Sequence, residues 1–333
     1  MGYRVLILID HQSHNITNSV YQLANRFFLH PKIGEVFVAS RSDVSNLAFF
    51  SKHSSLDLHA VKVDSGFSFD STGQQFDHVS NRINLQEMDM VVLRLPHPLD
   101  EAFFHFISEN FPPEKMINRP QGIIQTGNKL FLLKLQSWCP PIRWCTTFAE
   151  IIDFHQAYNL VLKPLRSYGG KGIVRIYDGV LEDTYGVKIP LSKAELFLTD
   201  LKRDGYLAMQ YLENVHLGDK RIVVVNGKIV GAALRIPAAG SWVCNVSQGG
   251  HAEAAFADER EAMMADAIHK VVSPLGIGIF GMDTLVDDNG QRVLSEINTL
   301  SVGGFGPMEM QHQKPIPALV ADELISFYEQ NSK

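Results

Sequence analysis

Two carboxylates and one amide lie on two β-rich runs that a turn sequence separates. Asp283 lies on the first run, and Glu296 and Asn298 lie on the second, within the stretch Phe280–Leu300. Because alternate residues of a strand point to the same face, Glu296 and Asn298 share a face, and Asp283 joins them if it lies across the ladder. Such oxygen donors suit Mg²⁺, which takes one or two carboxylates and leaves room for phosphates and water. A hairpin with solvated acids is the alternative; the apolar neighbours of both acids favour the metal site.

A glycine-rich stretch follows a lysine that lies among apolar residues. Lys163 falls within the predicted strand LVLKPL, where an ammonium group needs a partner because burying an unpaired charge is unfavourable. The next residues, SYGGKGI, contain Gly169, Gly170 and Gly172, which allow positive φ and let backbone N–H groups surround an anion. The spacing matches neither a P-loop nor a dinucleotide-binding fingerprint. Such a loop is more often only a turn; beside Lys163 it predicts a flexible loop over phosphates.

A second hairpin carries two arginines. The runs RIVVV and KIVGAALRI are joined by Asn226–Gly227, the strongest short-range hairpin signal. Arg221 and Arg235 flank this hairpin, and two guanidinium groups near acids and a phosphate loop suit binding of a multivalent anion. The alternative is a pair of surface salt bridges, which contribute little to stability.

The N-terminal part reads as an open α/β domain over about residues 1–120. Tyr3–Ile9, Glu35–Ala39 and Met90–Leu95 have the composition of buried strands, and Thr17–Phe28 has a helical pattern. Ligands of such sheets bind outside the carboxyl ends of the strands. This rule selects four candidate lining residues, each of which could equally be a loop polar group: Asp10, Ser13, Arg94 and His97.

Elsewhere the pattern predicts four helices and two irregular segments. One helix is expected to start after Asn128, which would cap it. The other three are expected to span Phe148–Gln156, Asp258–Val272 and Pro315–Gln330. Ala238–Gly250 is small and Gly-rich, which predicts a mobile loop, and residues 51–80 have no clear assignment.

Composition narrows the class of protein. The 333 residues are 45% hydrophobic and 20% charged, which is ordinary for a globular protein with two or three domains. A net charge of −6 argues against nucleic acid as the main partner. Three cysteines without metal-like spacing favour a reduced, cytoplasmic setting. No run reaches membrane-spanning length, and the short apolar N-terminus ends in an acid, unlike a signal peptide.

Seven short motifs occur in one order between about residues 90 and 300. They are LRLPHPLD (93–100), INRPQGI (117–123), GNKLF (127–131), VLKPLRSYGGKGI (161–173), GDKRIVVVNG (218–227), LRIP (234–237) and GMDTLV…LSEINTLS (281–301). In their order and spacing the chain resembles an ATP-grasp ligase, most closely the bacterial glutathione synthetase family. The resemblance implies an α/β (α+β) ATP-grasp fold with an N-terminal open α/β domain, a small central lid domain and a C-terminal mixed-sheet domain. We place these domains at residues 1–120, 121–212 and 213–333.

The resemblance also implies roles for single residues on the nucleotide side. Lys129 and Lys163 would neutralise ATP phosphates, and Asp219 would hold the ribose. The lid that closes on the phosphates would contain Gly169, Gly170 and Gly172, and the adenine hinge would contain Gln210, Tyr211 and Leu212.

At the reaction centre, Arg221 and Arg235 would face the γ-phosphate and the acyl-phosphate as catalytic residues. The triad Asp283, Glu296 and Asn298 would bind Mg²⁺, with Mn²⁺ as a possible replacement. The substrate side would comprise Asp10, Ser13, Arg94, Ser301, Gly303 and Gly304.

The implied activity is ATP-dependent ligation of a carboxylate to an amine through an acyl-phosphate, with glutathione formed from γ-glutamylcysteine and glycine. The partners would be amino acids or short peptides rather than nucleic acid or membrane, and a homo-oligomer is expected from the family. Two features depart from the family: Val243 stands where it usually has an arginine, and Ser301–Gly303 replaces Ser-Pro-Thr. Three alternatives therefore remain open: a ligase for another pair of substrates, a nucleotide-binding homologue without turnover, and a plain α/β binding protein.

Overall fold

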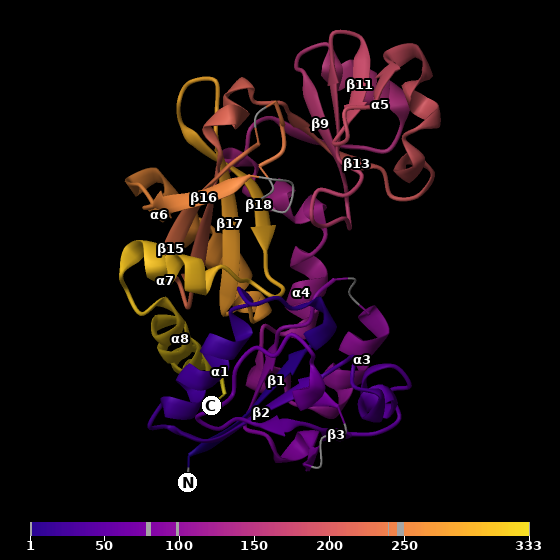
Figure 1. The fold of residues 1–333 in the computed structure, drawn as a ribbon. Helices are drawn as coiled ribbons and strands as arrows, with labels where there is room; N and C mark the ends of the chain where they lie inside the picture. The colour runs from indigo at the N-terminus through magenta and orange to yellow at the C-terminus, as the bar shows by residue number, and fades with distance from the viewer. Residues whose placement is uncertain (1, 78–80, 98–99, 239, 245–249, 333) are drawn as a thin grey trace.

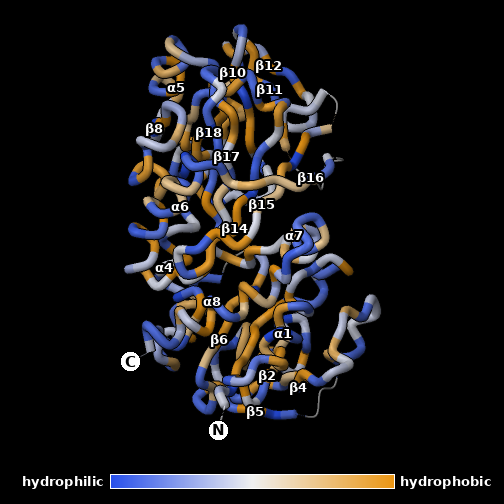
Figure 2. The backbone as a smooth tube through the Cα atoms, turned by 90° about the vertical axis from the view of Figure 1, so that its left-hand side faces the viewer, coloured by the Kyte–Doolittle hydropathy of each residue, from blue (hydrophilic) through white to orange (hydrophobic). Residues whose placement is uncertain are grey.

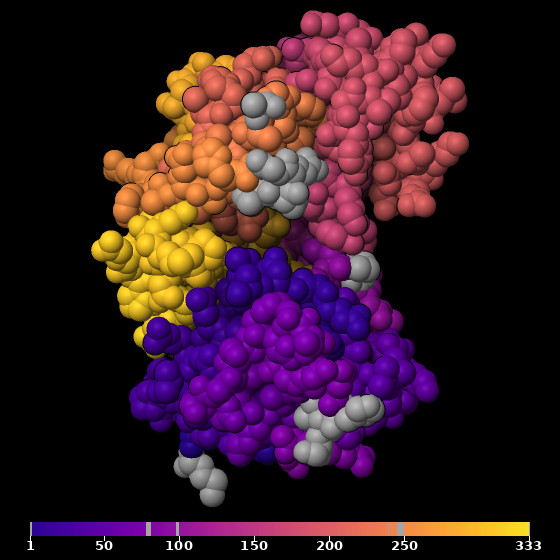
Figure 3. Space-filling view, in the orientation of Figure 1, coloured from indigo at the N-terminus to yellow at the C-terminus, as the bar shows by residue number. Residues whose placement is uncertain are grey.

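The computed structural model describes residues 2–77, 81–97, 100–238, 240–244 and 250–332. These residues form three larger β-sheets and a two-stranded ribbon, with helices packed around them (Figure 1). We call the three parts the N-terminal lobe, the lid and the C-terminal lobe. Figure 2 shows hydrophobic stretches along the strands in the interior of the molecule, and Figure 3 shows the lobes as adjoining masses.

The N-terminal lobe is built on a sheet with strand order β4-β2-β1-β6-β7. Its strands are β1 (Tyr3–Ile9), β2 (Ile33–Ser40), β4 (Val61–Lys62), β6 (Met90–Leu93) and β7 (Met116–Ile117). β1 is parallel to β2 and β6, and β6 is parallel to β7, which confirms the predicted open α/β arrangement. The carboxyl ends of β1 and β6 therefore lie at one edge of the sheet.

The segment that lacked an assignment, residues 51–80, joins this lobe. It contributes edge strand β4, which pairs antiparallel with β2, and β3 (Asp57–His59), which pairs with β5 (Arg82–Asn84). Phe67 and Phe76 are buried. Residues 78–80 lie outside the described residues.

Helix α1 (Val20–Leu29) begins three residues later than predicted. Asn15 accepts a hydrogen bond from the N–H of Thr17, and Asn18 accepts one from the N–H of Val20. These local side-chain bonds hold the chain in turns that compete with helix, which is why helical periodicity alone placed the start too early.

The lid carries an antiparallel sheet with strand order β12-β11-β10-β9-β13-β8. The strands are β8 (Ile142–Cys145), β9 (Leu160–Pro164), β10 (Val174–Tyr177), β11 (Val180–Asp183), β12 (Lys188–Pro190) and β13 (Tyr206–Gln210). The helix α5 (Phe148–His155) begins with a capping box between Thr147 and Glu150.

The C-terminal lobe carries an antiparallel sheet with strand order β16-β15-β14-β17-β18. The strands are β14 (Asp219–Val225), β15 (Lys228–Ile236), β16 (His251–Ala255), β17 (Ile279–Val286) and β18 (Arg292–Asn298). Asn226 and Gly227 have φ of 49° and 78°, the two positive values that a tight type I′ hairpin turn needs. Both hairpins that the sequence predicts are therefore present.

The remaining elements are helical. The α-helices are α2 (Leu47–Phe50), α3 (Glu101–Asn110), α4 (Pro120–Thr126), α6 (Glu259–Val272), α7 (Phe305–His312) and α8 (Ile316–Asn331). Short 3₁₀ segments span His11–Ser13, Val44–Asn46, Gln74–Phe76, Leu85–Glu87, Pro113–Lys115, Leu191–Leu196, Thr199–Lys202, Glu213–Leu217 and Ser273–Leu275. The helix predicted after Asn128 is also a 3₁₀ segment, Lys129–Trp138, and Asn128 caps it by accepting from the N–H of Leu130.

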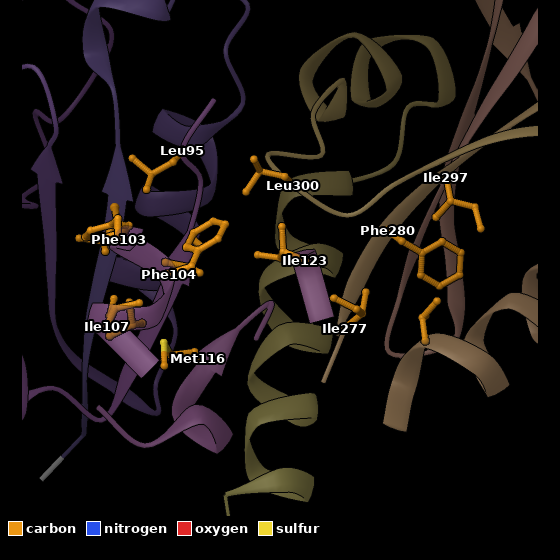
Figure 4. Packing of buried hydrophobic residues seen from close by; sticks show 14 of the residues in the cluster. Leu95, Phe103, Phe104, Ile107, Met116, Ile123, Ile277, Phe280, Ile297 and Leu300 are labelled. Atoms are coloured by element: carbon orange, nitrogen blue, oxygen red, sulfur yellow. The ribbon is translucent and has the colours of Figure 1, made fainter. Parts of the chain in front are cut away.

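One hydrophobic core runs from the N-terminal lobe into the C-terminal lobe. Phe104 on one side and Phe280 on the other belong to the same buried cluster, and Ile123 and Leu300 lie between them (Figure 4). Asn118 adds a polar joint: its amide donates to the carbonyls of Ile279 and Thr299 at 2.6 Å each and accepts from the N–H groups of Gly278 and Ile279. The two lobes are thus packed as one body.

Each larger sheet takes its strands from one of the three predicted domain ranges. Helix α8 nevertheless packs against α1 of the N-terminal lobe, where Lys32 pairs with Glu329 at 2.7 Å. The boundaries at residues 120 and 212 stay predictions. None of the described helices has the length and apolarity to cross a lipid bilayer.

Candidate active site

A cavity of about 260 Å³ lies between the sheet of the lid and the sheet of the C-terminal lobe. Twelve of the residues singled out by sequence line it: Lys163, Gly169, Gly170, Gln210, Tyr211, Leu212, Asp219, Arg221, Arg235, Asp283, Glu296 and Asn298. They come from the lid and the C-terminal lobe and from stretches far apart in sequence, so the tertiary structure brings them together.

The three oxygen-bearing side chains share one face of the β17–β18 hairpin. Asp283 pairs directly with Glu296 in the ladder, and the amide nitrogen of Asn298 lies 3.3 Å from Asp283 Oδ2. Asp283 is buried, whereas the Glu296 side chain is 34% exposed to the cavity side. Two carboxylates and an amide that can present its oxygen are the hard donors that Mg²⁺ takes beside phosphate oxygens. The residues present therefore fit a magnesium ion.

A bulge in the hairpin creates this arrangement. The ladder pairs Asp283 with Glu296 but Thr284 with Leu294, so Ser295 is an extra residue on β18. A β-bulge changes the direction of the side chains around it. Here it brings Glu296 to the face of Asp283 and presents Ser295 to Lys163.

Two arginines neutralise Asp283. Arg221 donates to both carboxylate oxygens of Asp283, with a distance of 2.8 Å from its Nη2 to Oδ2. Arg235 Nη2 lies 3.0 Å from the same Oδ2. Burial by itself would raise the pKa of Asp283, but the Arg221 and Arg235 guanidinium groups outweigh burial and lower it well below the usual range. Asp283 is therefore ionised at neutral pH, which a metal ligand requires.

The pKa of Asp219 is shifted in the opposite direction to that of Asp283. It accepts two hydrogen bonds of 2.6 Å from Arg235, yet burial and the nearby Asp283 charge raise its pKa to about 6. The pKa of Arg235 is raised above its ordinary value, because Asp283 and Asp219 outweigh the effect of burial. Two acids thus share one arginine at the wall of the cavity.

The two lysines approach Glu296 and Ser295 from the other side. Lys163 is buried on β9 and donates to the carbonyl of Ser295 at 2.9 Å and to its hydroxyl at 3.1 Å. The partners of its buried ammonium group are therefore neutral oxygens. Lys129 donates to the carbonyl of Ser167, and its Nζ lies 3.9 Å from Glu296. Burial and the charge of Lys163 lower the pKa of Lys129, against the effect of Glu296.

The Gly-rich loop, Ser167–Ile173, borders the same space. Gly169, Gly170 and Gly172 have φ of 63°, 78° and 71°, values that favour glycine. Gly169 and Gly170 line the main cavity, while Gly172 packs near Pro164, where a Cβ atom would lie 3.0 Å from the proline ring.

The hinge residues have some of their backbone groups already engaged. The N–H groups of Gln210 and Tyr211 donate to the carbonyls of Pro141 and Asn159. These two N–H groups are therefore already paired within the protein. The Tyr211 hydroxyl accepts from Arg175 at 3.2 Å, and the Gln210 amide donates to Asp288 at 3.0 Å.

A smaller chamber adjoins the cavity and shares Glu296 and Asn298 with it. Lys129, Ser167, Tyr168 and His97 also line this chamber. Burial and the charge of Lys129 lower the pKa of His97, so its imidazole is neutral near pH 7.

Part of the predicted substrate side assembles around Arg94. This buried arginine donates to the carbonyl of Val302 and to Ser19, and the Ser301 hydroxyl donates to the Arg94 carbonyl at 3.2 Å. Burial lowers the pKa of Arg94 to about 10, and within the described residues its Nε has no hydrogen-bond partner. Gly303 and Gly304 follow in the same loop, with Gly304 at the start of α7.

The remaining predicted substrate residues lie at the edge of the N-terminal sheet. Asp10 pairs with Arg41 at 2.8 Å and with Ser42, and the Ser13 hydroxyl donates to the Asp10 carbonyl. None of the six predicted substrate residues is among the described residues that line the two spaces above: Asp10, Ser13, Arg94, Ser301, Gly303 and Gly304.

Sequence reasoning missed several lining residues. Trp242 and Cys244 come from the loop after β15, most of which lies within the segment Ala238–Gly250 whose residues 239 and 245–249 are outside the described part. Val161, Met209 and Leu285 form an apolar wall. Alternation could have identified Val161 from Lys163, since residues i and i+2 of a strand share a face.

The fold and this site define an ATP-grasp ligase, an enzyme that uses ATP to form a carbon–nitrogen bond. A family model, "Prokaryotic glutathione synthetase, ATP-grasp domain", matches residues 128–313, and the chain belongs to this family. Its enzymes use ATP with divalent metal ions in general.

Similar proteins support the same placement. The chain is 29% identical over 245 residues to a glutathione synthetase of Brucella melitensis biotype 1, covering 72% of this chain and 74% of the relative. It is 28% identical to a glutathione synthetase of Parasynechococcus marenigrum, covering 74% and 77%.

Solved structures of other ligases share the fold. The D-cycloserine synthetase DcsG matches with a TM-score of 0.64 at 14% identity, covering 98% of this chain and 99% of that one. The ATP-grasp ligase PsnB, complexed with precursor peptide PsnA2 and AMPPNP, matches with a TM-score of 0.58 at 13% identity, covering 97% and 98%. At such identities the likeness establishes the fold alone.

Proposed function

We propose that this ligase joins the cysteine carboxylate of γ-glutamylcysteine to the amino group of glycine, with ATP converted to ADP and phosphate. The observation that carries this proposal is the pairing of two charge sets across one cavity. Asp283 and Glu296 face the cavity from one hairpin, and Lys163 lines it from the lid, while Lys129 lies 3.9 Å from Glu296 in the adjoining chamber. The names of the relatives, glutathione synthetases at 28–29% identity, support the choice of substrates.

The nucleotide would lie between the two sheets. Lys129 and Lys163 would neutralise its phosphates, the Gly-rich loop with Gly169, Gly170 and Gly172 would cover them, and Gln210, Tyr211 and Leu212 would border the base. Asp219 would face the ribose, although its bonds to Arg235 must then be shared or rearranged.

Asp283, Glu296 and Asn298 would hold the magnesium ion. When bound, the ion supplies charge that draws the phosphate oxygens together and offsets the negative charge that develops on them. Manganese has a similar preference for oxygen ligands and could replace it.

In the first step, an oxygen of the donor carboxylate attacks the γ-phosphorus of ATP, and the bond from that phosphorus to the bridging oxygen of ADP breaks. Arg221 and Arg235 would stabilise the transferring phosphoryl group and the acyl-phosphate that results. In the second step, the amine nitrogen attacks the acyl carbon, the carbon–oxygen bond to phosphate breaks, and the amine proton is lost. No side chain of the enzyme acts as a nucleophile, so positioning and charge stabilisation carry the catalysis.

The substrate acids and amines would contact the N-terminal lobe and the loop after β18. We assign this side to Asp10, Ser13, Arg94, Ser301, Gly303 and Gly304. The contact of Arg94 with Val302 and Ser301 supports a common site for the last four.

The test is ADP release by the purified enzyme with ATP, Mg²⁺, γ-glutamylcysteine and glycine, together with mass spectrometry of the product. We expect glutathione and one ADP per amide bond. ADP release that depends on a different acid–amine pair, with no glutathione, would refute the substrates while keeping the ligase. No acceptor-dependent ADP release with any of a panel of pairs would favour a nucleotide-binding homologue without turnover.

A ligase for a different pair of amino acids or peptides is the second candidate. Val243 lines the cavity next to Trp242, so this wall is apolar where the resemblance implies an arginine. Such a wall favours an acyl donor that has no carboxylate facing Val243, because an unpaired carboxylate would lose its hydration there. The substrates stay amino acids or short peptides in both cases, and a homo-oligomer in the cytoplasm is expected for both; light scattering tests the oligomer.

A further inference from the structure

The N-terminal lobe contacts the Gly-rich loop of the lid at two points. The imidazole of His97, just after β6, is stacked on the Tyr168 ring, with centroids 4.4 Å apart and planes 11° apart. Glu101, the first residue of α3, pairs with Arg166, the residue immediately before the loop. Two side chains of the N-terminal lobe therefore contact the lid, one at the Gly-rich loop and one at the residue just before it.

The tip of the loop is rich in glycine. A Cβ atom at Gly169 would meet open space, and its three glycines give the backbone freedom to move. Lys129 holds its first residue by donating to the Ser167 carbonyl. Tyr168 thus joins the middle of the loop to the N-terminal lobe.

Tyr168 lies where the loop meets the reacting groups. Tyr168, His97, Glu296 and Asn298 all line the small chamber beside the main cavity. A loop that lifts away from His97 opens this chamber to solvent, and water near an acyl-phosphate competes with the amine.

The same stretch of chain also contacts the predicted substrate loop. Arg94, three residues before His97, binds the carbonyl of Val302, and Ser301 donates to the Arg94 carbonyl. Residues 94–97 thus touch the loop after β18 on one side and the Gly-rich loop on the other.

We propose that His97 and Glu101 are positioning residues that keep the Gly-rich loop closed, so that ATP cleavage leads to amide formation rather than to hydrolysis. The proposal rests on the ligase activity of the family and on the place of this loop over the phosphates in the proposed function; it does not depend on glutathione being the product. Stacking between the two rings, rather than charge, is what His97 provides.

The first experiment measures loop opening without turnover. Arg166 and Lys171 are trypsin sites before and within the loop. With Mg²⁺ and a non-hydrolysable ATP analogue bound, His97→Ala should speed cleavage at these sites by about fivefold, the effect expected for one aromatic contact. His97→Phe, which keeps a stacking ring, should restore most of the protection.

A matched control comes from the lid itself. His155 in α5 is half-buried and bonds the Tyr158 carbonyl, away from the Gly-rich loop. His155→Ala should leave the cleavage rate unchanged.

Glu101→Gln should speed cleavage by about twofold, because its partner Arg166 is more than half exposed and such pairs are weak. If His97→Ala does not fold, Tyr168→Ala removes the same stack from the other side.

The second experiment measures coupling. The ratio of ADP released to amide formed should be near one in the wild type and should rise at least twofold in His97→Ala, with His97→Phe close to wild type. A purely structural role would lower both products together and leave this ratio unchanged.

Equal cleavage rates and equal coupling in His97→Ala and wild type would overturn the proposal. If γ-glutamylcysteine and glycine give no amide in the wild type, the proposed substrates are wrong. The trypsin experiment still tests whether His97 and Glu101 keep the Gly-rich loop closed, because it needs only nucleotide.

Discussion

Asp283 and Glu296 lie directly opposite each other across the ladder of β17 and β18, although Thr284, the next residue, is paired with Leu294. The bulge at Ser295 produces this offset. It sets two carboxylates on one face and turns a serine toward Lys163, whose Nζ binds both Ser295 oxygens. A single extra residue in a strand therefore connects the proposed metal site to the proposed phosphate site.

Glu296→Gln should nearly abolish turnover while ATP binding remains. The change keeps the shape of the side chain but removes a charge from the proposed metal site, and loss of one such stabilising group lowers kcat by about a hundredfold or more. Steady-state ADP formation and nucleotide titration measure the two properties. Glu253→Gln, at an exposed acid on β16 of the same sheet, should have no effect. Wild-type rates in Glu296→Gln would show that the metal triad is misassigned.

Lys163→Met should weaken ATP binding without unfolding the protein. The methionine has a similar volume and removes a buried charge whose partners are neutral serine oxygens. We expect the KM for ATP to rise about tenfold or more, which corresponds to a loss of about 1.4 kcal/mol. The melting temperature should change little, since a buried ammonium group without an acid partner stabilises little. Lys270→Met, at an exposed pair on α6, is the control. An unchanged KM would separate Lys163 from the phosphates.

Val243→Arg tests the wall of the cavity. If an acidic donor faces this wall, a guanidinium group there should lower its KM by about tenfold, because a charge-assisted bond replaces an apolar contact. The KM for γ-glutamylcysteine measures the effect. Val187→Arg, at an exposed valine of the lid outside the cavity, gives the background of an added charge. A raised KM in Val243→Arg alone would indicate that the donor presents an apolar group to Val243.

Glu261→Gln should destabilise the C-terminal lobe. Glu261 is fully buried, accepts from Lys220 at 2.6 Å and from Thr284 at 2.6 Å, and completes the capping box of α6 with Asp258. Neutralising it leaves the buried Lys220 without its counter-charge, which costs about 3 kcal/mol of unfolding free energy. Urea denaturation measures the loss. Asp266→Asn breaks the exposed pair with Lys270 and should change the stability by less than about 0.5 kcal/mol. Comparable effects of both changes would contradict the role of burial.

The three cysteines should resist alkylation in the folded protein. Burial raises the pKa of Cys139 to about 12, that of Cys145 to about 11 and that of Cys244 to about 12. The thiolate is the reactive form, so at pH 8 folded Cys145 should react on the order of a hundredfold, and folded Cys139 and Cys244 on the order of a thousandfold, more slowly than the unfolded thiols. Their rates should rise about tenfold per pH unit between pH 7 and 9. Iodoacetamide labelling with peptide mass spectrometry measures each site; rapid labelling of Cys244 would show that the cavity wall opens.

Local pattern was sufficient for much of the fold. The strands Tyr3–Ile9 and Lys228–Ile236 have the predicted bounds, and the Asn226–Gly227 turn and the Asn128 cap occur where turn and capping chemistry place them. These features depend on neighbours within a few residues, and so the sequence carries them directly. The order of the motifs likewise indicates the family, which the family model confirms.

Residue types, strand alternation and the resemblance to the family together selected the charged groups that line the cavity, while their roles stay predictions. What alternation could not supply is the Ser295 bulge, because a bulge is a property of two paired strands. The binding of both Arg221 and Arg235 to Asp283 depends on the pairing of β14 with β15 and with β17, as does the elevated pKa of Asp219.

The tertiary structure alone decided the contacts between lobes. Asn118 joins β7 to the C-terminal sheet, and His97 meets Tyr168 across two lobes. Such contacts join residues far apart in sequence, and their energy comes from burial and fit once the chain has closed on itself, which no local window contains. Sequence thus determined which chemical groups are available and on which strands they lie; packing of the three sheets determined which of them meet.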